Sequence, residues 1–587
     1  MLTRYFAFIS LLFLLSCAQP TQESEPVIDR PNVILVITDD QGYGDLGFHG
    51  NSLIQTPRID AFAQQSIRFD NFHVSPVCAP TRASLLTGRY SLRTGIRDTY
   101  NGGAIMAPGE VTVAEVLGDA GYSTGIFGKW HLGDNYPSRP MDQGFEESLI
   151  HLAGGMGQPG DVTNFFAGTD SSYFDPILWH NGATEQYEGY CSDVFTDQAV
   201  EFIEQNAEKP FFCYLAYNAP HTPLQVPQAY YDMYADVDPT TATEQPIRHT
   251  MTEKDKEDAR RVYGMVSNID WNFGKVLDKL DELDITDKTI VIFMTDNGPQ
   301  QRRYNDYMNG RKGSVYRGGT RVPFFFRYPS KFPEQAQIDA ITAHLDVLPT
   351  LTELCRATLP NDRSIDGQSM IPLLNGDEAD WADRSLFFYW TRRYPELYHN
   401  IALQKGAHKL VGHTDYNAQL SDFELFNVQE DPSELENLVA NNKEMATELK
   451  GELDRIYSEL VNSPNLVTPP RIAVGSEYEN PTVLNRNDAG GERGLWTQEE
   501  VHGMWKVAIA AGQYNVKFKF IQPIEGGGKM YLETGTIVHQ AMQSEGGDVI
   551  VMNNVNLPNI ECNLIPFYAY QGKRIFPFSV EMERIAP

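Results

Sequence analysis

Polar and charged side chains that could bind a metal ion and an anion follow four apolar runs of the sequence. The runs are NVILVIT, STGIF, PFFCYLAY and TIVIFMT, and the residues after them are Asp39, Asp40, Lys129, His131, His221, Asp296 and Asn297. Carboxylate and amide oxygens are the ligands that Ca²⁺ and Mg²⁺ prefer. Each residue alone has a structural explanation, because a single aspartate often caps a turn and a single histidine often makes a structural hydrogen bond. Together they indicate a divalent-cation site with basic side chains beside it.

A cysteine stands at the start of a predicted helix in the segment VCAPTRASLLTG, residues 77–88. Cys78, Pro80 and Arg82 occupy alternate positions at that start. The N-terminal end of a helix carries a partial positive charge, which favours an anionic or oxygen-bearing group. The alternative is a buried structural cysteine. We interpret the segment as a place for chemistry at residue 78.

The apolar runs before these residues are predicted to be buried parallel strands. Their C-terminal ends carry the polar residues, which is where sites lie in open α/β sheets. The longest amphipathic segment between them, residues 255–283, has Val262, Val266, Ile269 and Phe273 at helical spacing. It is predicted to be a crossover helix. The pattern predicts an α/β fold with helices flanking a central sheet.

The succession of patterns along the chain predicts several domains. At 587 residues the chain is longer than one core usually organises. Residues 31–370 are predicted to form the main α/β domain and residues 371–461 a smaller C-terminal α+β subdomain. The polar, proline-rich residues 462–471 are predicted to be a linker. Residues 472–587 alternate in polarity and are broken by glycines, which predicts a β-rich domain, either a small antiparallel sheet or a sandwich.

The N-terminus has the pattern of an export signal. Arg4 precedes an apolar run, residues 6–15, that is too short to span a bilayer. The residues LLSC resemble a bacterial lipoprotein box, which implies cleavage before Cys17 and acylation of its thiol; an ordinary secretory signal is the alternative. We therefore assign residues 1–17 to a signal peptide and residues 18–30 to a tether. The expected location is the periplasm or the cell surface, through a lipid anchor in the membrane at Cys17, or secretion without acylation.

Charge and cysteine content limit the partners and cross-links. The formal net charge of -31, from 78 acidic and 47 basic side chains, argues against nucleic acid as a partner. It does not exclude an anionic substrate, because a pocket can be locally basic. Of the six cysteines, Cys191, Cys213, Cys355 and Cys562 could pair, but their spacing defines no disulfide framework, and Cys213 is expected to be a buried thiol.

The segment around Cys78 resembles the signature of type I sulfatases, which belong to the alkaline phosphatase superfamily. The matching residues are Cys78, Ala79, Pro80, Thr81, Arg82, Leu85, Thr87 and Gly88. The resemblance extends to about Leu438, where ELFNVQEDPSELENL looks like the family's closing segment. It implies an alkaline phosphatase-like mixed sheet and hydrolysis of a sulfate ester. It also implies that a formylglycine-generating or maturation enzyme, recognising Pro80 and Arg82, oxidises Cys78 to Cα-formylglycine (3-oxoalanine).

The resemblance also implies the chemistry of the site. An aldehyde hydrate at residue 78 supplies an oxygen nucleophile and, unlike a thiol, a way to release the sulfate. Asp296 accepts the proton of the attacking hydroxyl, His221 protonates the leaving oxygen, and His131 deprotonates the second hydroxyl. The cation, Ca²⁺ ahead of Mg²⁺, is held by Asp39, Asp40, Cys78 as formylglycine, Asp296 and Asn297. The residues that bind the sulfate or the hydrate are Arg82, Lys129, His221 and Lys312.

Substrate specificity is expected to come from loops outside this pocket. Aromatic faces stack on sugar rings, and arginines pair with carboxylates or further sulfates. Candidate subsite residues are His180, Arg302, Arg303, Trp390, Arg392 and Arg393; packing of the smaller domain is the alternative for the aromatic ones. The expected substrate is a sulfated polysaccharide or oligosaccharide, with algal ulvan or carrageenan ahead of host glycosaminoglycans. The alternatives are a phosphate or phosphonate monoester hydrolase and a non-catalytic glycan-binding lipoprotein.

Overall fold

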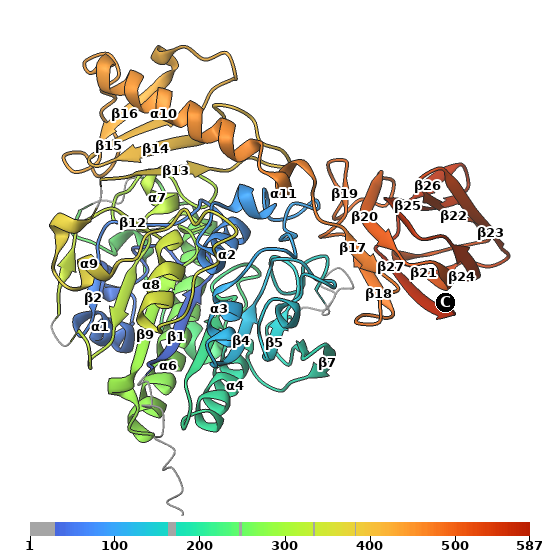
Figure 1. The fold of residues 1–587 in the computed structure, drawn as a ribbon, viewed down its shortest axis with the longest axis horizontal. Coiled ribbons are helices and arrows are strands. Elements are labelled where there is room, and N and C mark those ends of the chain that lie inside the picture. The colour runs from blue at the N-terminus through green and yellow to red at the C-terminus, as the bar shows by residue number, and fades with distance from the viewer. Residues whose placement is uncertain (1–29, 162–171, 246–248, 333–334, 382, 587) are drawn as a thin grey trace, which may run out of the picture.

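The computed structural model describes residues 30–161, 172–245, 249–332, 335–381 and 383–586, which are the coloured parts of Figure 1. The predicted signal peptide, Cys17 and all but the last residue of the predicted tether lie outside the described residues. Within the described ranges, no helix has both the length and the apolarity that crossing a membrane requires.

A ten-stranded mixed sheet forms the centre of the main domain (Figure 1). From edge to edge its strands are β11 (Gln337–Ile338), β2 (Ile67–Phe69), β10 (Phe324–Arg327), β9 (Thr289–Thr295), β1 (Asn32–Thr38), β8 (Phe211–Ala216), β4 (Ser123–Lys129), β5 (Glu147–His151), β6 (Ile177–His180) and β7 (Ala183–Gln186). The strands from β9 to β5 are parallel, and every residue of β1, β4, β8 and β9 is buried. This confirms the prediction of buried parallel strands. Strand β10 runs antiparallel to β9 and makes the sheet mixed.

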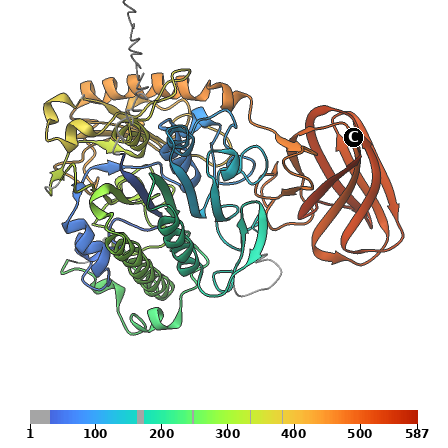
Figure 2. The ribbon, with the colours of Figure 1, turned by 60° about the horizontal axis from the view of Figure 1, so that its bottom comes forward.

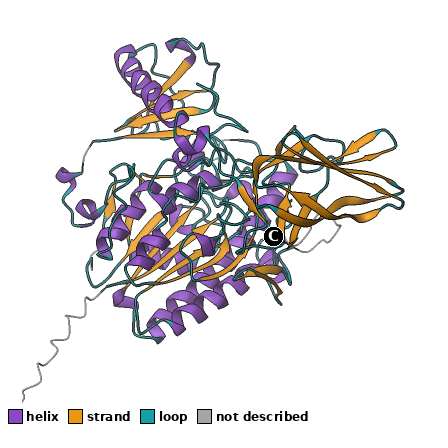
Figure 3. Ribbon diagram, turned by 45° about the vertical axis from the view of Figure 1, so that its right-hand side comes forward, coloured by secondary structure: helices purple, strands orange, loops and turns teal. Residues whose placement is uncertain are grey.

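Two layers of helices cover the sheet (Figures 2 and 3). One layer contains α1 (Pro57–Gln64), α4 (Cys191–Gln205) and α6 (Glu253–Glu282), and the other contains α2 (Cys78–Thr87), α3 (Val113–Asp119) and α8 (Val347–Leu354). Successive residues of a strand face opposite sides of a sheet, so Ile34 of β1 packs beneath the first layer and Leu35 beneath the second. The predicted crossover helix is α6, which begins at a capping box between Thr252 and Asp255. Shorter elements are α5 (Gln228–Asp232), α7 (Arg317–Thr320), α9 (Ile371–Leu374), β3 (Phe72–His73) and β12 (Thr342–Ala343).

A smaller subdomain lies against the main domain, at the top of Figure 1. Its antiparallel sheet consists of β13 (Ser385–Tyr389), β14 (Ile401–Lys405), β15 (His408–Gly412) and β16 (Phe423–Asn427), and α10 (Lys443–Val461) packs on that sheet. Arg317 of α7 is buried at the seam, where Nη1 donates to the carbonyl oxygen of Val428 at 2.6 Å. Its backbone N–H donates to Glu434 Oε2 at 2.8 Å. These bonds hold the segment that carries Lys312 against the subdomain.

The C-terminal residues form a β-sandwich beside the main domain, at the right of Figure 1. In the first sheet the strand order is β17 (Ile472–Val474), β20 (Gly503–Ile509), β25 (Ile560–Tyr570), β22 (Gly528–Thr534) and β23 (Ile537–Gln543). Two short strands extend it, β19 (Gly490–Gly491) beside β20 and β26 (Lys573–Ile575) beside β25. In the second sheet the order is β18 (Thr482–Asn485), β27 (Ser579–Ala586), β21 (Gly512–Ile524) and β24 (Gly547–Leu557). Their inner faces enclose a hydrophobic core that includes Trp505 and Tyr514. Of the two expected architectures, the domain is the sandwich.

Ordered contacts join the sandwich to the main domain. The segment expected to be a linker contains a short helix, α11 (Pro464–Val467), whose Asn465 Nδ2 donates to the carbonyl oxygen of Arg93 at 2.9 Å. Asn485 Nδ2 donates to Asp134 Oδ2 at 2.9 Å. The backbone N–H of Gly491 donates to Asn101 at 2.8 Å. The sandwich is therefore docked on loops of the main domain that lie close to the site described next.

The five cysteines of the described residues are buried and free. The four that could have paired therefore form no disulfide. Cys213 lies in β8 with no exposed surface, as expected for a buried thiol.

Candidate active site

The residues predicted to act together follow neighbouring strands at one edge of the sheet. Thr38 and Thr295, the last residues of β1 and β9, are paired, so the side chains of Asp39 and Asp296 start side by side. Lys129 ends β4, and β8, which carries His221 on the loop after it, lies between β1 and β4. The parallel order of these strands brings together residues that are far apart in the sequence.

Four buried oxygen-bearing side chains meet at this edge, namely Asp39, Asp40, Asp296 and Asn297. The Asp40 backbone N–H donates to Asp296 Oδ1 at 3.2 Å, and Asn297 Nδ2 donates to Asp40 Oδ1 at 2.8 Å. Burial, together with the nearby charge of Asp39, raises the pKa of Asp296 above its ordinary range. Crowded carboxylates are costly unless cations lie beside them.

Two lysines contact these carboxylates. Lys129 Nζ donates to Asp39 Oδ2 at 2.6 Å, and Lys312 Nζ lies 2.7 Å from Asp40 Oδ1. Burial acts against the charge of Asp40, but the charges of Lys312 and His221 and the hydrogen bonds from Lys312 and Asn297 together outweigh it and hold the pKa of Asp40 below its usual range. Lys129 has no exposed side-chain surface, whereas Lys312 retains 16% and is open to the cavity.

Helix α2 presents two further residues to the cluster. Cys78 is its first residue, and Arg82 lies one turn later on the same face. The Arg82 guanidinium donates from Nη2 to Asp296 Oδ2 at 2.9 Å and from Nη1 to the carbonyl oxygen of Lys129 at 3.0 Å. Burial raises the pKa of the Cys78 thiol. Arg82 therefore connects the helix to the strand ends and fixes the orientation of Asp296.

His131 contacts the side chain of residue 78. Its Nδ1 lies 3.5 Å from Cys78 Sγ, and its Nε2 lies 2.7 Å from the carbonyl oxygen of Thr99. A carbonyl oxygen only accepts, so the Nε2–H donates to Thr99 and Nδ1 presents a lone pair to residue 78. Burial, with the charge of Lys129, lowers the pKa of His131 well below its ordinary value. The ring is held as a neutral base.

His221 is oriented in the opposite way. Its Nδ1 donates to the carbonyl oxygen of Thr222 at 2.6 Å, and its Nε2 lies 3.7 Å from Asp40 Oδ2. The Nε2 atom therefore faces the carboxylate cluster. Burial, with the charge of Lys312, lowers the pKa of His221 to about 3. A further negative charge beside the ring would raise this pKa.

Two of these residues have a left-handed backbone. Asp40 has φ of 65° and His131 has φ of 61°. Residues other than glycine adopt this region rarely, and such exceptions concentrate at functional sites, where the surrounding structure holds them. Each strained position is the second residue after its strand, β1 or β4, where the chain turns and directs the side chain toward the site.

A divalent cation fits the cluster. Asp39 Oδ1 and Asn297 Oδ1 are buried and accept no hydrogen bond within the described part of the chain, and a buried oxygen without a partner costs free energy unless something binds it. One ligand atom each from Asp39, Cys78 and Asp296 lie within 4.8 Å of one another. Oxygen donors of this kind suit Ca²⁺ or Mg²⁺.

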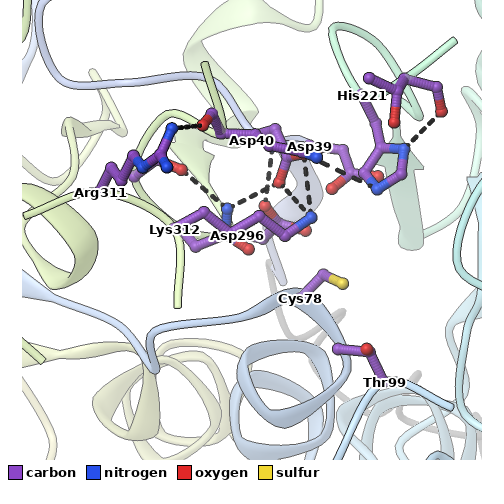
Figure 4. A network of polar contacts seen from close by, with 12 residues as sticks. Asp39, Asp40, Cys78, Thr99, His221, Asp296, Arg311 and Lys312 are labelled. Carbon is purple, nitrogen blue, oxygen red and sulfur yellow. Dashed lines mark hydrogen bonds and ion pairs between the residues drawn. The ribbon is translucent and has the colours of Figure 1, made fainter. Parts of the chain in front are cut away.

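A cavity of about 1070 Å³ opens beside the cluster. Cys78, His131, His221 and Lys312 line it. Figure 4 shows Asp39, Asp40 and Asp296 gathered between Lys312 and His221, with the side chain of Cys78 beside them. The volume lies at the upper end of ordinary ligand pockets, which measure roughly 300–1,000 Å³. A ligand can therefore reach the cluster and extend beyond it.

The structure divides the candidate subsite residues into two groups. Trp390 and Arg392 line the cavity. The other four do not. Arg303 is fully buried in an ion pair with Asp45, and His180 contacts Glu147 and Glu185 near the far edge of the sheet. Arg302 lines a separate cavity, and Arg393 is not among the residues that line the active-site cavity. The placement of Arg302, Arg303, His180 and Arg393 beside the substrate pocket is therefore corrected. Gln301 and Arg392, which are the sequence neighbours of Arg302 and Arg393, do line the cavity, whereas ion pairs direct the side chains of Arg303 and His180 elsewhere.

Several residues of the site were not predicted individually. Thr99 supplies the carbonyl that orients His131, and Gly154 and Gly155 lie against the two histidine rings. A Cβ atom on Gly154 would lie 2.9 Å from the His131 ring, and one on Gly155 would lie 2.9 Å from the His221 ring. Both glycines lie in the loop that follows β5, and the sequence analysis singled out neither of them. The close packing of two rings on adjacent glycines leaves no signal in a single sequence.

The family assignment rests on two matches. Residues 31–357 match the sulfatase family model, and residues 308–459 match the model of the N-sulphoglucosamine sulphohydrolase C-terminal region. The chain belongs to the sulfatase family. This confirms the resemblance seen in the segment around Cys78, and the enzyme is a sulfuric ester hydrolase. Both matches end before the β-sandwich, so neither family model covers that domain.

Curated relatives of this sulfatase act on different sulfate esters. N-acetylgalactosamine-6-sulfatase of Canis lupus familiaris is 30% identical over 414 residues, which cover 65% of this chain and 72% of that protein. N-acetylglucosamine-6-O-sulfatase of Bacteroides thetaiotaomicron is 27% identical over 518 residues, which cover 73% of this chain and 86% of that protein. Human steryl-sulfatase is 29% identical over 453 residues, covering 62% and 73%.

Solved structures share the fold. The crystal structure of Ps i-CgsB in complex with k-i-k-neocarrahexaose superposes with a TM-score of 0.64 at 29% identity, covering 74% of this chain and 94% of that one. The phosphonate monoester hydrolase of Agrobacterium radiobacter superposes with a TM-score of 0.54 at 20% identity, covering 73% and 96%. At that identity the second comparison shows the fold alone, a mixed sheet flanked by helices.

Proposed function

We propose that this sulfatase removes sulfate from a sulfated carbohydrate, with Cys78 oxidised to Cα-formylglycine and Ca²⁺ bound at the strand ends. The observation that carries the proposal is that Cys78, Lys312 and two oppositely oriented histidines, His131 and His221, line one cavity beside the carboxylate cluster. A sulfate ester carries one negative charge and needs both a nucleophile and a proton for the leaving oxygen. The site offers a residue for the nucleophile, cationic groups for the sulfate and a histidine for the proton.

The cation would be held by the oxygens of Asp39, Asp40, Asp296 and Asn297. When bound, it polarises the sulfate and lowers the pKa of a hydroxyl on residue 78. Formylglycine, as its hydrate, supplies an oxygen nucleophile and a route for releasing sulfate. In the structure the Cys78 Sγ atom stands in for that oxygen, and one of its polar neighbours is His131 Nδ1.

The chain's own residues bind the sulfate and move its protons. Lys312 and Lys129 direct their ammonium groups to the carboxylate cluster next to residue 78, where a sulfate oxygen can share their N–H donors. Asp296, oriented by Arg82, is the acceptor for the proton of the attacking hydroxyl. His131, neutral and with its lone pair on the residue 78 side, takes a proton from that side chain in the second half of the reaction.

His221 is the proposed general acid. Its Nε2 must carry a proton to serve the leaving oxygen, although burial and Lys312 lower its pKa when the cavity holds no anion. A bound sulfate ester adds a negative charge beside the ring, which favours the protonated form. The hydrogen bond from Nδ1 to the Thr222 carbonyl keeps Nε2 directed into the site.

The proposed substrate class is a sulfated algal polysaccharide or its oligosaccharides, of the carrageenan or ulvan type. Support comes from the carrahexaose complex of the similar structure at 29% identity and from the aromatic and arginine side chains Trp390 and Arg392 in the cavity wall. Sugar rings offer apolar faces for the first and anionic groups for the second.

The deciding experiment measures sulfate release by ion chromatography from carrageenan, ulvan and glycosaminoglycan oligosaccharides, with phosphate monoesters alongside. Protein matured by a formylglycine-generating enzyme is compared with Cys78→Ala. Sulfate released from one glycan class by the mature protein alone supports the proposal. Phosphate release without sulfate release contradicts it. Mass spectrometry of the residue 78 peptide, seeking replacement of CH₂SH by CHO, tests the modification separately.

We also propose that the protein is exported and held at the membrane by acylation of Cys17, or secreted if Cys17 is not acylated. The export pattern of residues 1–17 supports this. Cys17→Ala should move the protein from the membrane fraction to the soluble fraction and abolish incorporation of labelled palmitate. Unchanged fractionation would contradict the anchor.

A further inference from the structure

One wall of the active-site cavity comes from the β-sandwich. Gly494, Leu495 and Trp496 line the same cavity as Cys78 and His131. These three residues lie between β19 and β20, on the side of the sandwich that docks on the main domain. The cavity of this sulfatase is therefore completed by a part of the chain beyond the family models.

Trp496 belongs to a cluster of aromatic and arginine side chains. Its ring and that of Tyr100 have centroids 5.0 Å apart and planes inclined by 69°. The Arg392 guanidinium carbon lies 5.0 Å from the Tyr100 ring centroid and 4.7 Å from that of Trp390. All four residues line the cavity. The main domain, the smaller subdomain and the sandwich each contribute to one continuous surface.

The main-domain side of this surface is rigidly held. Asp98, which has no exposed surface, accepts hydrogen bonds from Trp390 Nε1 at 3.3 Å and from Arg392 Nη1 at 3.1 Å. Arg392 also donates to Thr99 Oγ1 at 2.9 Å. The backbone carbonyl of the same residue, Thr99, orients His131. A single loop therefore connects the aromatic wall to the catalytic site.

The sandwich side is held just as firmly. Leu495, only 1% exposed, is inserted into the hydrophobic core of the sandwich. The fully buried Arg486 donates from Nη1 to the carbonyl oxygens of Leu495 at 3.0 Å and Gln498 at 2.8 Å. Trp496 therefore projects from a fixed support, and little conformational entropy is lost when a ligand packs on it.

The Arg392 side chain is free to bind an anion. It is 54% exposed, and its Nε and Nη2 make no hydrogen bond with any residue in the described part of the chain. Its pairing with Asp98 fixes the plane of the guanidinium without using these donors. A planar fork with open donors suits a sulfate or a carboxylate.

We propose that Trp496, Tyr100, Trp390 and Arg392 form a subsite for the sugar unit next to the one that carries the cleaved sulfate. The aromatic rings bind the apolar face of that sugar, and Arg392 binds an anionic substituent on it. The β-sandwich is thus a specificity-determining part of the active site. This inference rests on the proposed carbohydrate substrate. The cavity volume of about 1070 Å³ exceeds what a single sulfated ring needs.

The test compares two substrates in four proteins. The substrates are the sulfated oligosaccharide that the wild type hydrolyses fastest and 4-nitrophenyl sulfate, which has no neighbouring sugar unit. Trp496→Ala should reduce kcat/KM for the oligosaccharide about tenfold more than for the aryl sulfate, mainly through KM. Trp496→Phe, which keeps an aromatic face, should recover most of the difference. Trp271→Ala is the matched control, because Trp271 is 62% exposed on α6 and does not line the cavity.

A second variant tests the anion contact. Arg392→Gln should lower kcat/KM most for oligosaccharides whose neighbouring unit carries a sulfate or carboxylate, and least for those whose neighbouring unit is neutral. Binding of the same oligosaccharides to Cys78→Ala protein, measured by calorimetry, separates affinity from turnover. Thermal melting of each variant checks that the sandwich remains folded.

The outcomes separate the two proposals. If Trp496→Ala lowers kcat/KM by the same factor for both substrates, or for neither, the subsite is overturned and the sulfatase reaction stays in place. If the wild type hydrolyses 4-nitrophenyl sulfate but neither hydrolyses nor binds any oligosaccharide, the carbohydrate substrate fails and the subsite fails with it. Preferential loss on the oligosaccharide supports both.

Discussion

Gly155 controls the position of His221, and its replacement by alanine makes the sharpest test of the proposed general acid. A Cβ atom at residue 155 would lie 2.9 Å from both Cε1 and Nδ1 of the His221 ring, whereas ordinary contacts begin at 3.4 Å. The backbone conformation of Gly155 is one that alanine can adopt, since its φ is not in the left-handed range. The ring must therefore retreat by about 0.5 Å in a closely packed interior.

The retreat disturbs the ring because Nδ1, one of the two contacted atoms, is anchored. Nδ1 donates to the Thr222 carbonyl at 2.6 Å, so the ring cannot move without stretching or rotating this bond. A misplacement of about 1 Å at a reacting group can cost roughly 100-fold in rate. Half that displacement predicts a loss of about tenfold in kcat/KM, equivalent to about 1.4 kcal/mol.

The leaving group identifies which function is lost. 4-Nitrophenolate leaves without a proton, whereas the alkoxide of a sugar requires one. Gly155→Ala should therefore reduce kcat/KM for a sulfated sugar about tenfold and for 4-nitrophenyl sulfate much less. Gly154→Ala moves the His131 ring by a similar contact of 2.9 Å and should affect both substrates equally, because His131 acts at residue 78. Gly109→Ala is the control, since a Cβ there meets nothing within 4 Å.

The reasoning would be refuted by a Gly155→Ala enzyme that loses activity equally on both substrates. It would also be refuted by a fully active enzyme, since the 2.9 Å contact would then be relieved without displacing the His221 ring. Steady-state kinetics with the two substrates, together with unchanged thermal melting, decide between these results.

Three further outcomes are expected. Asp39→Asn should abolish the rise in melting temperature that Ca²⁺ gives the wild type over chelator-treated protein, because Asp39 supplies a buried, unpartnered oxygen to the proposed cation; an equal calcium shift in both proteins would count against the site. Burial raises the pKa of Asp134 to about 6 and also raises the pKa of Asp488 beside it. The folded state therefore binds more protons than the unfolded state between about pH 4 and pH 6, and the stability that this pair contributes falls as the pH rises through that range. Asp488→Asn should flatten this fall in calorimetric scans across pH, and a pH profile parallel to that of the wild type would contradict it. Gly451→Ala, in α10 with nothing within 4 Å of the added Cβ, should stabilise the fold by about 0.5–1 kcal/mol in denaturant titration, and a destabilised variant would show that α10 needs the flexibility.

The chemistry of the site could be predicted from the sequence because its signals are local. Asp39, Asp296 and Lys129 each stand at the end of an apolar run, and buried parallel strands place their ends at one edge. Cys78 and Arg82 are four residues apart, which puts them on one face of any helix that starts there. These relations depend on strand and helix periodicity, so they hold before the tertiary packing is known.

The substrate wall could not be predicted in the same way. Arg302, Arg303 and His180 have suitable side chains, but local ion pairs and packing direct them away from the cavity. Trp496 has no neighbour in the sequence that marks it, and it enters the cavity only because the sandwich docks on the loop of Tyr100. The direction of a loop side chain depends on contacts between segments far apart in the chain.

The division between the two kinds of information is therefore physical. The amino-acid sequence by itself determined the fold class, the strand ends that gather the carboxylates, and the helix start that presents Cys78, since strand burial and helix phase express themselves over a few residues. Only the tertiary structure decided that Gly154 and Gly155 seat the two histidines and that the β-sandwich closes the cavity with Trp496. Those features arise from close packing and domain docking, which leave no periodic pattern of residues in the sequence.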